Sequence, residues 1–374
     1  MCVVKQYIKY RLNLLCGCLL FTLTVFGCGK KGPVGYSIIK ERGGKVCDTS
    51  VVITEYKTYS IFKSTASSAY LFVGKEEGFE ARSLLYFEIP DTIQVDTTRF
   101  TLSNIDSMEL TIYDVEGTGH VAVCRIVESW SRDSISWIKR DTLLWNTPGG
   151  DIADTIAYCT IEEDTFTVAL PISAIDTTNF DANAVSIMLV PVVVSQDSFM
   201  LKFASKNSYS RPCLTLTMHK DTIDTTYQLY PKKDAFIDTS YYILPSELIK
   251  VETGSHVARC SLSFFVDLDT LAKISSAKLL MRIESIYGSM GLIATHLDTI
   301  SDKTIASAAI SVSSEDTLVS MDIADIVQKW LSDRQFVLTL KSSKEASEIA
   351  RIVMDPAKAS LYIVYTLPPQ ERFQ

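Results

Sequence analysis

Tryptophans and charged side chains gather in one short stretch of the chain, between residues 128 and 145. The stretch holds three of the four tryptophans together with an arginine and two aspartates: Trp130, Trp137, Trp145, Arg132, Asp133 and Asp141. An indole face stacks well on the apolar face of a sugar ring, and charged groups can hydrogen-bond sugar hydroxyls. This composition indicates a candidate ligand-binding site. Large aromatic side chains also fill the cores of β-sandwiches, so core packing is the alternative role for all three tryptophans.

Residues for catalysis do not form a recognisable motif. The four histidines are scattered, and the chain contains no His-Glu-x-x-His, no Gly-x-Ser-x-Gly and no phosphate-binding loop. Carboxylate pairs are numerous in so acidic a chain, and their spacing selects none of them. We therefore expect no enzymatic activity and no catalytic residues, with polysaccharide hydrolysis or lysis as the alternative.

Asp-Thr dipeptides recur along the chain, for example at Asp96-Thr97 and Asp221-Thr222. Both side chains hydrogen-bond nearby backbone groups, so the dipeptides predict turns and strand entries. Repeated aspartates also suit calcium, but the Asp-x-Asp-x-Asp-Gly loop of an EF-hand is absent. We expect no cofactor, with structural calcium as the alternative use of these turns.

The N-terminus has the pattern of an export signal. Basic residues up to Arg11 precede an apolar run over 12–27, which is shorter than the ~20 residues of a membrane-spanning helix. The run ends in Val-Phe-Gly-Cys, which resembles the bacterial lipobox. We therefore expect residues 1–27 to be a lipoprotein signal peptide and Cys28 to be lipidated. Cys18 is a competing lipidation site, but cleavage before it would leave apolar residues at the mature N-terminus. The further alternative is an ordinary signal peptide, with Cys28 an unmodified residue near the cleavage site.

Residues 28–50 follow this signal and contain several glycines, as expected of a flexible tether. The protein is then a membrane-anchored lipoprotein of the cell envelope, facing the periplasm or the cell exterior and touching the membrane through its lipid alone. The formal charge of −8 becomes −11 in the mature chain, because the leader carries three basic residues and no acidic one. So acidic a chain is a poor partner for nucleic acid, whose phosphates require clustered cations.

Five cysteines follow Cys28, and no two of them have the spacing of a zinc site. Their odd number leaves at least one thiol free unless it pairs between chains. Cys124, Cys213 and Cys260 stand within apolar strand patterns, where we expect them to be buried as small hydrophobic residues.

The mature chain alternates apolar and polar residues in short segments, as at 109–115 and 166–170, which predicts strands with one buried face. Several segments also recur in the same order in the two halves of the chain. The matched pairs are 81–87 with 258–264, 105–112 with 274–281, 164–175 with 316–326, and 210–216 with 357–363.

We therefore predict an all-β protein of two tandem antiparallel sandwich (jelly-roll) domains, 51–220 and 226–367. Apolar residues at helical spacing over 323–331 predict a short helix that plugs the second sandwich.

Several of these segments resemble the disaggregatase-related (DNRLRE-type) domain, a jelly roll grouped with carbohydrate-binding modules. The matching segments are Arg82-Ser83-Leu84-Leu85-Tyr86-Phe87, Trp130-Ser131-Arg132-Asp133-Ser134-Ile135-Ser136-Trp137, Arg211-Pro212-Cys213-Leu214-Thr215-Leu216, Asp234-Ala235-Phe236-Ile237 and Asp322-Ile323-Ala324-Asp325-Ile326-Val327-Gln328-Lys329-Trp330. The matches cover nearly the whole mature chain but are divided between the two halves. Arg132 stands where the family has Glu, and each half lacks one of the family's tryptophan motifs.

This resemblance implies tandem non-catalytic modules that bind a cell-surface or environmental polysaccharide. The alternative is a structural or adhesive envelope protein whose sandwiches act as spacers or bind a protein partner. The two readings differ in whether an exposed aromatic groove exists.

Overall fold

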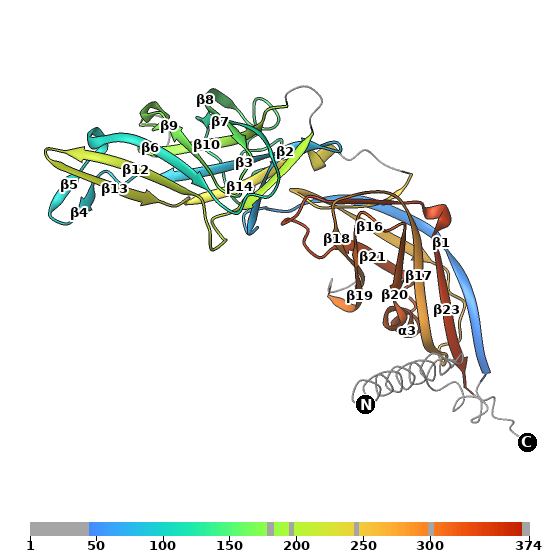
Figure 1. Ribbon diagram of the computed structural model, residues 1–374. Coiled ribbons are helices and arrows are strands. Elements are labelled where there is room, and N and C mark those ends of the chain that lie inside the picture. The colour runs from blue at the N-terminus through green and yellow to red at the C-terminus, as the bar shows by residue number, and fades with distance from the viewer. Residues whose placement is uncertain (1–44, 178–182, 194–197, 243–246, 298–302, 369–374) are drawn as a thin grey trace, which may run out of the picture.

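The computed structural model describes residues 45–177, 183–193, 198–242, 247–297 and 303–368. These residues fold mainly into antiparallel strands that form two lobes (Figure 1). The expectation of an all-β sandwich fold is therefore confirmed. The predicted signal peptide, Cys28 and most of the predicted tether lie outside the described residues. Within the described ranges, no helix combines the length and apolarity needed to cross a bilayer.

The first lobe contains a wide sheet of order β11-β2-β3-β10-β7-β8, with β14 also paired to β3, and a narrow sheet of order β13-β12-β6-β9. The wide sheet comprises β2 (Tyr70–Glu76), β3 (Phe79–Glu88), β7 (Gly119–Ile126), β8 (Ile152–Ile161), β10 (Ala184–Pro191), β11 (Phe199–Ala204) and β14 (Lys233–Asp238). The narrow sheet comprises β6 (Ile105–Ile112), β9 (Phe166–Leu170), β12 (Cys213–Lys220) and β13 (Ile223–Leu229), beside a small hairpin of β4 (Ile93–Val95) and β5 (Thr98–Phe100) and the 3-10 turns η1 (Leu102–Asn104) and η2 (Ile172–Ala174).

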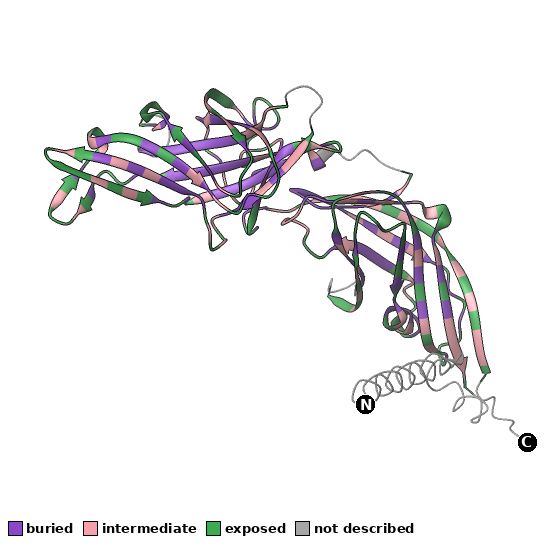
Figure 2. Ribbon diagram, viewed as in Figure 1, coloured by how far each residue is buried: buried purple, intermediate pink, exposed green. Residues whose placement is uncertain are grey.

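Alternate residues of these strands point between the two sheets and form the lobe's core. Leu85 and Phe87 of β3 and Leu110 of β6, for example, are fully buried in one cluster. Figure 2 shows buried residues running along the strands inside each lobe. The period of two that is visible in the sequence is therefore the alternation of core-facing and outward-facing side chains.

The second lobe has wide and narrow layers of the same kind. Its strands are β1 (Lys45–Phe62), β15 (Ile249–Glu252), β16 (His256–Phe264), β17 (Lys273–Tyr287), β18 (Met290–Leu297), β19 (Thr304–Val312), β20 (Leu318–Asp322), β21 (Val337–Ser342), β22 (Arg351–Met354) and β23 (Ser360–Leu367), with the 3-10 turns η3 (Thr239–Tyr242) and η4 (Pro356–Lys358). The long strands β1 and β17 each pair with strands of both layers, so all ten strands join into one continuous sheet.

Helix α3 (Ala324–Asp333) lies where the sequence places a helix. Its Ile326, Val327 and Trp330 side chains are buried in the core of the second lobe. The helix ends at Arg334, whose left-handed backbone conformation stops the helical hydrogen bonding.

The two lobes share one strand order, which agrees with the repeat seen in the sequence. The run β22-β15-β16-β21-β18-β19 of the second lobe matches β11-β2-β3-β10-β7-β8 of the first, and β23-β17-β20 matches β12-β6-β9. The sequence pairs 81–87 with 258–264 and 105–112 with 274–281 fall on equivalent strands, namely β3 with β16 and β6 with β17.

The predicted domain boundaries differ from the strand pairing. Residues 51–62, expected in the first sandwich, lie in β1 and pair with β23 and β16 of the second lobe. Residues 233–238, expected in the second sandwich, form β14 and pair with β3 of the first lobe. Alternating apolar residues predict a strand but do not specify the sheet edge that it joins, so the sequence pattern could not reveal this exchange.

The expected burial of three cysteines is confirmed. Cys124, Cys213 and Cys260 are buried, and Cys47 and Cys159 are half-buried. These five, all the cysteines among the described residues, are free thiols.

Two of the Asp-Thr dipeptides form hairpin turns as expected. Asp96 and Asp221 have left-handed φ values of 52° and 56° in the two-residue turns β4–β5 and β12–β13. Asp154-Thr155 instead lies within β8, so the dipeptide does not always mark a turn.

Candidate functional site

The three tryptophans of the predicted ligand site are buried in the protein. Trp130, Trp137 and Trp145 are only 4%, 5% and 5% exposed. They belong to the β7–β8 connection, residues 127–151, which covers the outer face of the wide sheet of the first lobe. The prediction that their faces stack on a sugar is therefore wrong, and the alternative role in core packing is correct.

Hydrogen bonds to protein atoms hold these indoles in place. Trp130 Nε1 donates to Ser186 Oγ at 3.2 Å, and Trp145 Nε1 donates to the Ser136 carbonyl at 3.0 Å. A buried indole N–H needs such a partner, because leaving it unpaired would cost about 1–3 kcal/mol. The geometry is that of a structural cap on the sheet.

A close approach of the backbone completes this cap. The guanidinium of Arg82 lies 4.8 Å from the centre of the Trp137 ring and donates to the Gly149 carbonyl at 2.9 Å. Gly149 has φ +91°, and a Cβ built there would lie 2.8 Å from both the Trp137 ring and Arg82 Nη1. Only glycine fits between these two side chains.

The charged members of the predicted site also bind protein groups or solvent. Arg132 donates to the Ala66 carbonyl and, at 3.3 Å, to Asn207 Oδ1, so it ties the cap to neighbouring loops. Asp141 accepts a 3.0 Å hydrogen bond from Ser134 Oγ within the cap. Asp133 is exposed. The structure thus brings the six residues together in one segment without making a ligand platform of them.

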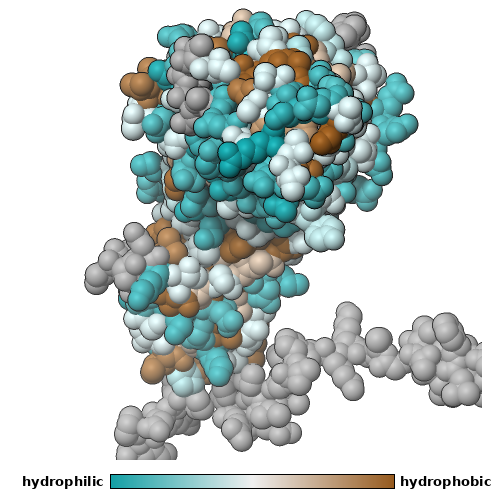
Figure 3. All heavy atoms as spheres, turned by 90° about the vertical axis from the view of Figure 1, so that its left-hand side faces the viewer, coloured by the Kyte–Doolittle hydropathy of each residue, from teal (hydrophilic) through white to brown (hydrophobic). Residues whose placement is uncertain are grey.

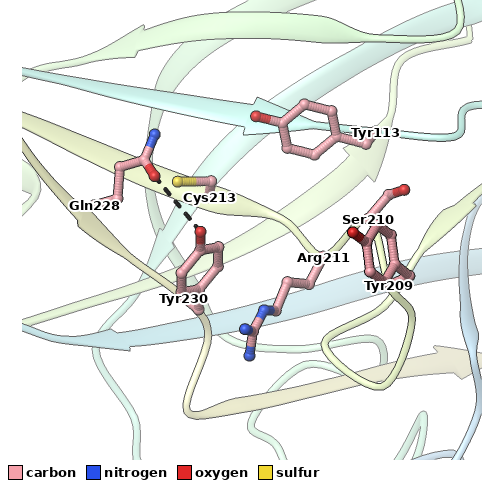
Figure 4. Close-up of a pocket in the computed structure, with 7 residues that line it drawn as sticks. All are labelled: Tyr113, Tyr209, Ser210, Arg211, Cys213, Gln228 and Tyr230. Atoms are coloured by element: carbon pink, nitrogen blue, oxygen red, sulfur yellow. Dashed lines mark hydrogen bonds between the residues drawn. The ribbon is translucent and has the colours of Figure 1, made fainter.

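An exposed aromatic groove lies elsewhere on the first lobe (Figure 4). Its volume is about 430 Å³. Three tyrosines from separate segments line it with an arginine, a glutamine, a serine and a cysteine: Tyr113, Tyr209, Tyr230, Arg211, Gln228, Ser210 and Cys213. No carboxylate is among these lining residues, although the protein carries a net negative charge.

The register of the narrow sheet explains why these distant residues meet. Cys213 at the start of β12 pairs with Thr111 near the end of β6, and Leu214 pairs with Leu229 at the end of β13. Residues that follow β6 and β13 and those that precede β12 therefore gather at one end of the sheet. They include Tyr113, Tyr230 and the segment 209–211.

The side chains of the groove present aromatic faces beside an arginine without an acidic partner. Tyr209 is fully exposed and Tyr230 is 44% exposed. The Arg211 guanidinium lies 4.2 Å from the centre of the Tyr230 ring, a cation–π arrangement, and forms no ion pair within the described part of the chain. The Tyr230 hydroxyl lies 3.5 Å from Gln228 Oε1.

The thiol of Cys213, which also lines the groove, is buried. Burial raises the pKa of Cys213 above its ordinary value, although the Thr215 hydroxyl and the nearby Arg211 partly oppose this. A protonated thiol is unreactive, since the thiolate is the attacking species. The chemistry available in the groove is therefore stacking and hydrogen bonding.

The sequence carried only a weak signal for this groove. Arg211 falls in one of the matched repeat segments, but Tyr113 is 96 residues before Tyr209, Tyr230 is 21 residues after it, and the three tyrosines share no motif. Only the strand register brings them together.

Two other hollows lie between the lobes, with volumes of about 550 and 270 Å³. In the larger, the Lys344 ammonium pairs with the Glu348 carboxylate at 2.7 Å. In the smaller, Arg351 pairs with the buried Glu252 at 2.7 Å, as does Lys250 at 3.3 Å. Because these charges neutralise one another, both hollows are better explained as lobe–lobe contacts than as ligand sites.

The histidines of the described residues remain apart from one another. His296 is buried, with Nε2 2.9 Å from Asp333 Oδ2 and Nδ1 3.1 Å from the Val337 carbonyl. His219 pairs with Asp224 across the exposed β12–β13 hairpin at 2.6 Å. Across the described ranges, no three His, Cys, Asp or Glu side chains are grouped so as to hold a metal ion.

No family model matches the chain, and no curated protein matches it. Among solved structures, the chain is similar to the infectious bursal disease virus VP2 subviral particle at 14% identity, covering 86% of this chain and 72% of that chain, with a TM-score of 0.17. The structure of the infectious bursal disease virus Gx strain gives 14% identity, 88% and 73% coverage and a TM-score of 0.18. TM-scores this low carry no argument about fold or function.

Proposed function

We propose that this protein is a lipid-anchored, extracytoplasmic, non-catalytic binding protein whose first lobe holds a polysaccharide in the tyrosine groove. The observation that supports this proposal is the groove itself, which combines two exposed tyrosines with an arginine that forms no ion pair among the described residues. Aromatic faces stack on sugar rings, and arginine, glutamine and tyrosine hydroxyl groups hydrogen-bond sugar hydroxyls and carboxylates. The resemblance to DNRLRE-type modules, drawn from the sequence, points to the same class of ligand.

The path of the chain suits a binding lobe held away from a membrane. Lys45 pairs with Leu367 at the end of the second lobe remote from the first lobe (Figure 1). An anchor at Cys28 would join the folded protein at this end, with the second lobe between the membrane and the groove. Figure 3 shows the outer end of the first lobe as mainly hydrophilic, with separate hydrophobic patches, as suits a surface exposed to water.

The chemistry of the groove favours acidic polysaccharides over neutral ones. Arg211 is the one charged residue among those that line it, and its guanidinium matches the planar carboxylate of a uronic acid or the oxygens of a sulfate ester. With no carboxylate in the lining, the groove itself does not repel an anionic ligand.

A binding screen of the protein tests this proposal. The protein is applied to a glycan array and to insoluble polysaccharides, once with calcium and once with chelator. Selective retention on one glycan class is the expected result. Loss of that retention in chelator would assign calcium to the Asp-rich turns, and a folded sample that binds no glycan would overturn the proposal.

One observation favours the alternative role as a structural or adhesive spacer. The lobes contact each other directly, since the Tyr287 hydroxyl donates to Glu76 Oε2 at 2.8 Å and Arg351 lies 4.2 Å over the Phe79 ring. Contacts of this kind suit a stiff spacer that displays a protein-binding surface. An absence of glycan retention, together with capture of a purified envelope protein, would support this alternative.

A further inference from the structure

Strand β1 occupies the same position in the second lobe as β13 and β14 occupy in the first. The N-terminal part of β1 pairs with β23 and its C-terminal part pairs with β16. In the first lobe, β13 pairs with β12 and β14 pairs with β3. Since β12 and β3 are the equivalents of β23 and β16, one long strand in one lobe corresponds to two shorter ones in the other.

The register of these pairings is also equivalent. Ala81 of β3 pairs with Asp238, and Ala258, which matches Ala81 in the repeat, pairs with Ser60. Ser60 and Asp238 thus stand at corresponding places. In chain order, however, β1 opens the first repeat and β13–β14 open the second. Each repeat therefore begins with a strand that lies in the other repeat's lobe.

The exchanged strands belong to the cores that receive them. Phe236 of β14 is fully buried in the first lobe, with its ring 5.0 Å from that of Phe72 in an edge-on contact. On β1, Val51, Ile53 and Tyr56 pack against the core of the second lobe. Each strand fills a position that would otherwise expose apolar side chains and unpaired backbone groups.

The two crossing segments are joined to each other where they pass between the lobes. Thr65, which follows β1, donates from Oγ1 to the Phe236 carbonyl at 2.7 Å and accepts from the Phe236 N–H at 3.2 Å. Asp238, at the end of β14, accepts from the Ser255 N–H at 2.6 Å, and Lys63 N–H donates to the Ser255 carbonyl at 2.9 Å. The described residues on either side of the crossover are thus hydrogen-bonded into the fold.

From these observations we infer that the two repeats are interlocked by reciprocal strand exchange. In the first lobe, β13 and β14 of the second repeat cover the edges of β12 and β3. In the second lobe, β1 of the first repeat covers the edges of β23 and β16. The lobes are then one folding unit, unlike two domains joined by a linker. Breaking the chain between the repeats would leave each lobe held by a strand from the opposite fragment.

A cut at the repeat boundary tests the inference in the full chain. A site for a sequence-specific protease is placed in the β12–β13 turn at Asp221-Thr222, and the cleaved protein is run on size exclusion in native buffer. We expect the fragments to elute together at the volume of the intact protein and to separate only in denaturant. Separation into two folded fragments in native buffer would overturn the inference.

Side-chain contacts between the lobes could also hold the fragments together, so the cut is repeated with those contacts weakened. Tyr287→Ala removes both the hydrogen bond to Glu76 and the contact between the Tyr287 and Phe79 rings, whose centres lie 5.2 Å apart, and about 1 M salt screens the charged contacts. Interlocked fragments stay together under these conditions, whereas fragments held by surface contacts alone come apart.

Hydrogen exchange on uncut protein gives a second readout that does not depend on the inserted site. Phe236→Ala and Phe264→Ala each truncate a phenylalanine of the second repeat. Phe236, however, lies in the core of the first lobe, whereas Phe264 lies in the core of the second. We expect Phe236→Ala to lower protection of β2 and β3, and Phe264→Ala to lower protection of β16 and β21. Loss of protection confined to residues 247–368 in both variants would contradict the exchange.

Discussion

The guanidinium of Arg211 lies 4.2 Å from the centre of the Tyr230 ring, at the edge of an open groove. Arg211 precedes the β12–β13 hairpin and Tyr230 follows it. They meet because Leu214 at the start of β12 pairs with Leu229 at the end of β13. This strand pairing places the Arg211 cation beside a partly exposed aromatic ring, and no acidic partner among the described residues neutralises its charge. A ligand can therefore meet a stacking surface and a hydrogen-bond donor at one place.

Replacing Arg211 tests the preference for acidic ligands. Arg211→Gln should reduce retention on uronic-acid or sulfated polysaccharides several-fold and leave any retention on neutral glycans nearly unchanged. The reason is that glutamine keeps hydrogen bonding but removes the charge. Binding is measured at low and high salt, and wild-type retention on acidic glycans should fall with salt.

Arg282→Gln is the matched control, since Arg282 is an exposed arginine of the second lobe. An equal loss in the two variants would indicate a general effect of charge. Unchanged binding of acidic glycans by Arg211→Gln would refute the charge preference while leaving the groove as a glycan site.

Trp145→Ala should destabilise the fold. Truncating a buried tryptophan typically costs about 3–5 kcal/mol of unfolding free energy, and here it also removes the hydrogen bond to the Ser136 carbonyl. Urea denaturation measures the change. Leu144→Ala, at the exposed neighbouring residue, should shift the midpoint little. A Trp145→Ala protein with wild-type stability would show that the cap is not part of the core.

The fold could be predicted from the sequence further than the site could. Alternation in segments such as 166–170 indicates burial on one face of a strand, and strand β9 and helix α3 lie where the pattern placed them. The same pattern cannot distinguish a tryptophan that faces a core from one that faces a ligand. Both situations need a large apolar surface, and Trp145 is buried by a cap whose path depends on turns and on Gly149.

The exchange of β1 and β14 was equally invisible in the sequence, because the two strands have equivalent patterns and equivalent acceptor edges. The tyrosine groove depends on register between distant strands. Tyr113 and Tyr230 become neighbours only when β6, β12 and β13 are aligned.

Asp234 should make stability depend on pH in a defined window. Burial raises the pKa of this carboxyl to about 6, although the Lys206 N–H, Arg132 and Lys206 charge oppose the shift. The unfolded value is about 3.9. Since the folded state binds this proton more tightly, its contribution to stability is present below pH ~4 and is lost as pH rises to about 6, an effect on the order of 3 kcal/mol.

Denaturation of wild type and Asp234→Asn between pH 4 and 7 isolates this contribution. Asparagine keeps an oxygen for the Lys206 N–H bond but does not titrate. Relative to the variant, wild type should lose stability as pH rises from about 4 to about 6. A constant gap between wild type and Asp234→Asn across this range would contradict the assignment.

The thiols of Cys159 and Cys260 should react slowly in the folded protein. Burial raises the pKa of Cys159 to about 11, and it does the same for Cys260, where hydrogen bonds from Thr58 and Lys57 partly oppose it. Because alkylation requires the thiolate, iodoacetamide at pH 8 should label these two residues only after unfolding. Mass spectrometry of peptides from native and urea-treated samples measures this. Rapid labelling of Cys260 in the native protein would show that the second lobe opens readily.

The most direct test of the account is quantitative binding of the retained glycan to Tyr230→Ala and to Tyr158→Ala. Tyr158 is a more exposed tyrosine on β8, outside the groove, so it controls for the loss of a surface aromatic. The account predicts that Tyr230→Ala weakens binding about tenfold or more, as truncating a central aromatic contact does, while Tyr158→Ala binds like wild type. Wild-type affinity in a folded Tyr230→Ala protein would contradict the claim that this groove is the binding site.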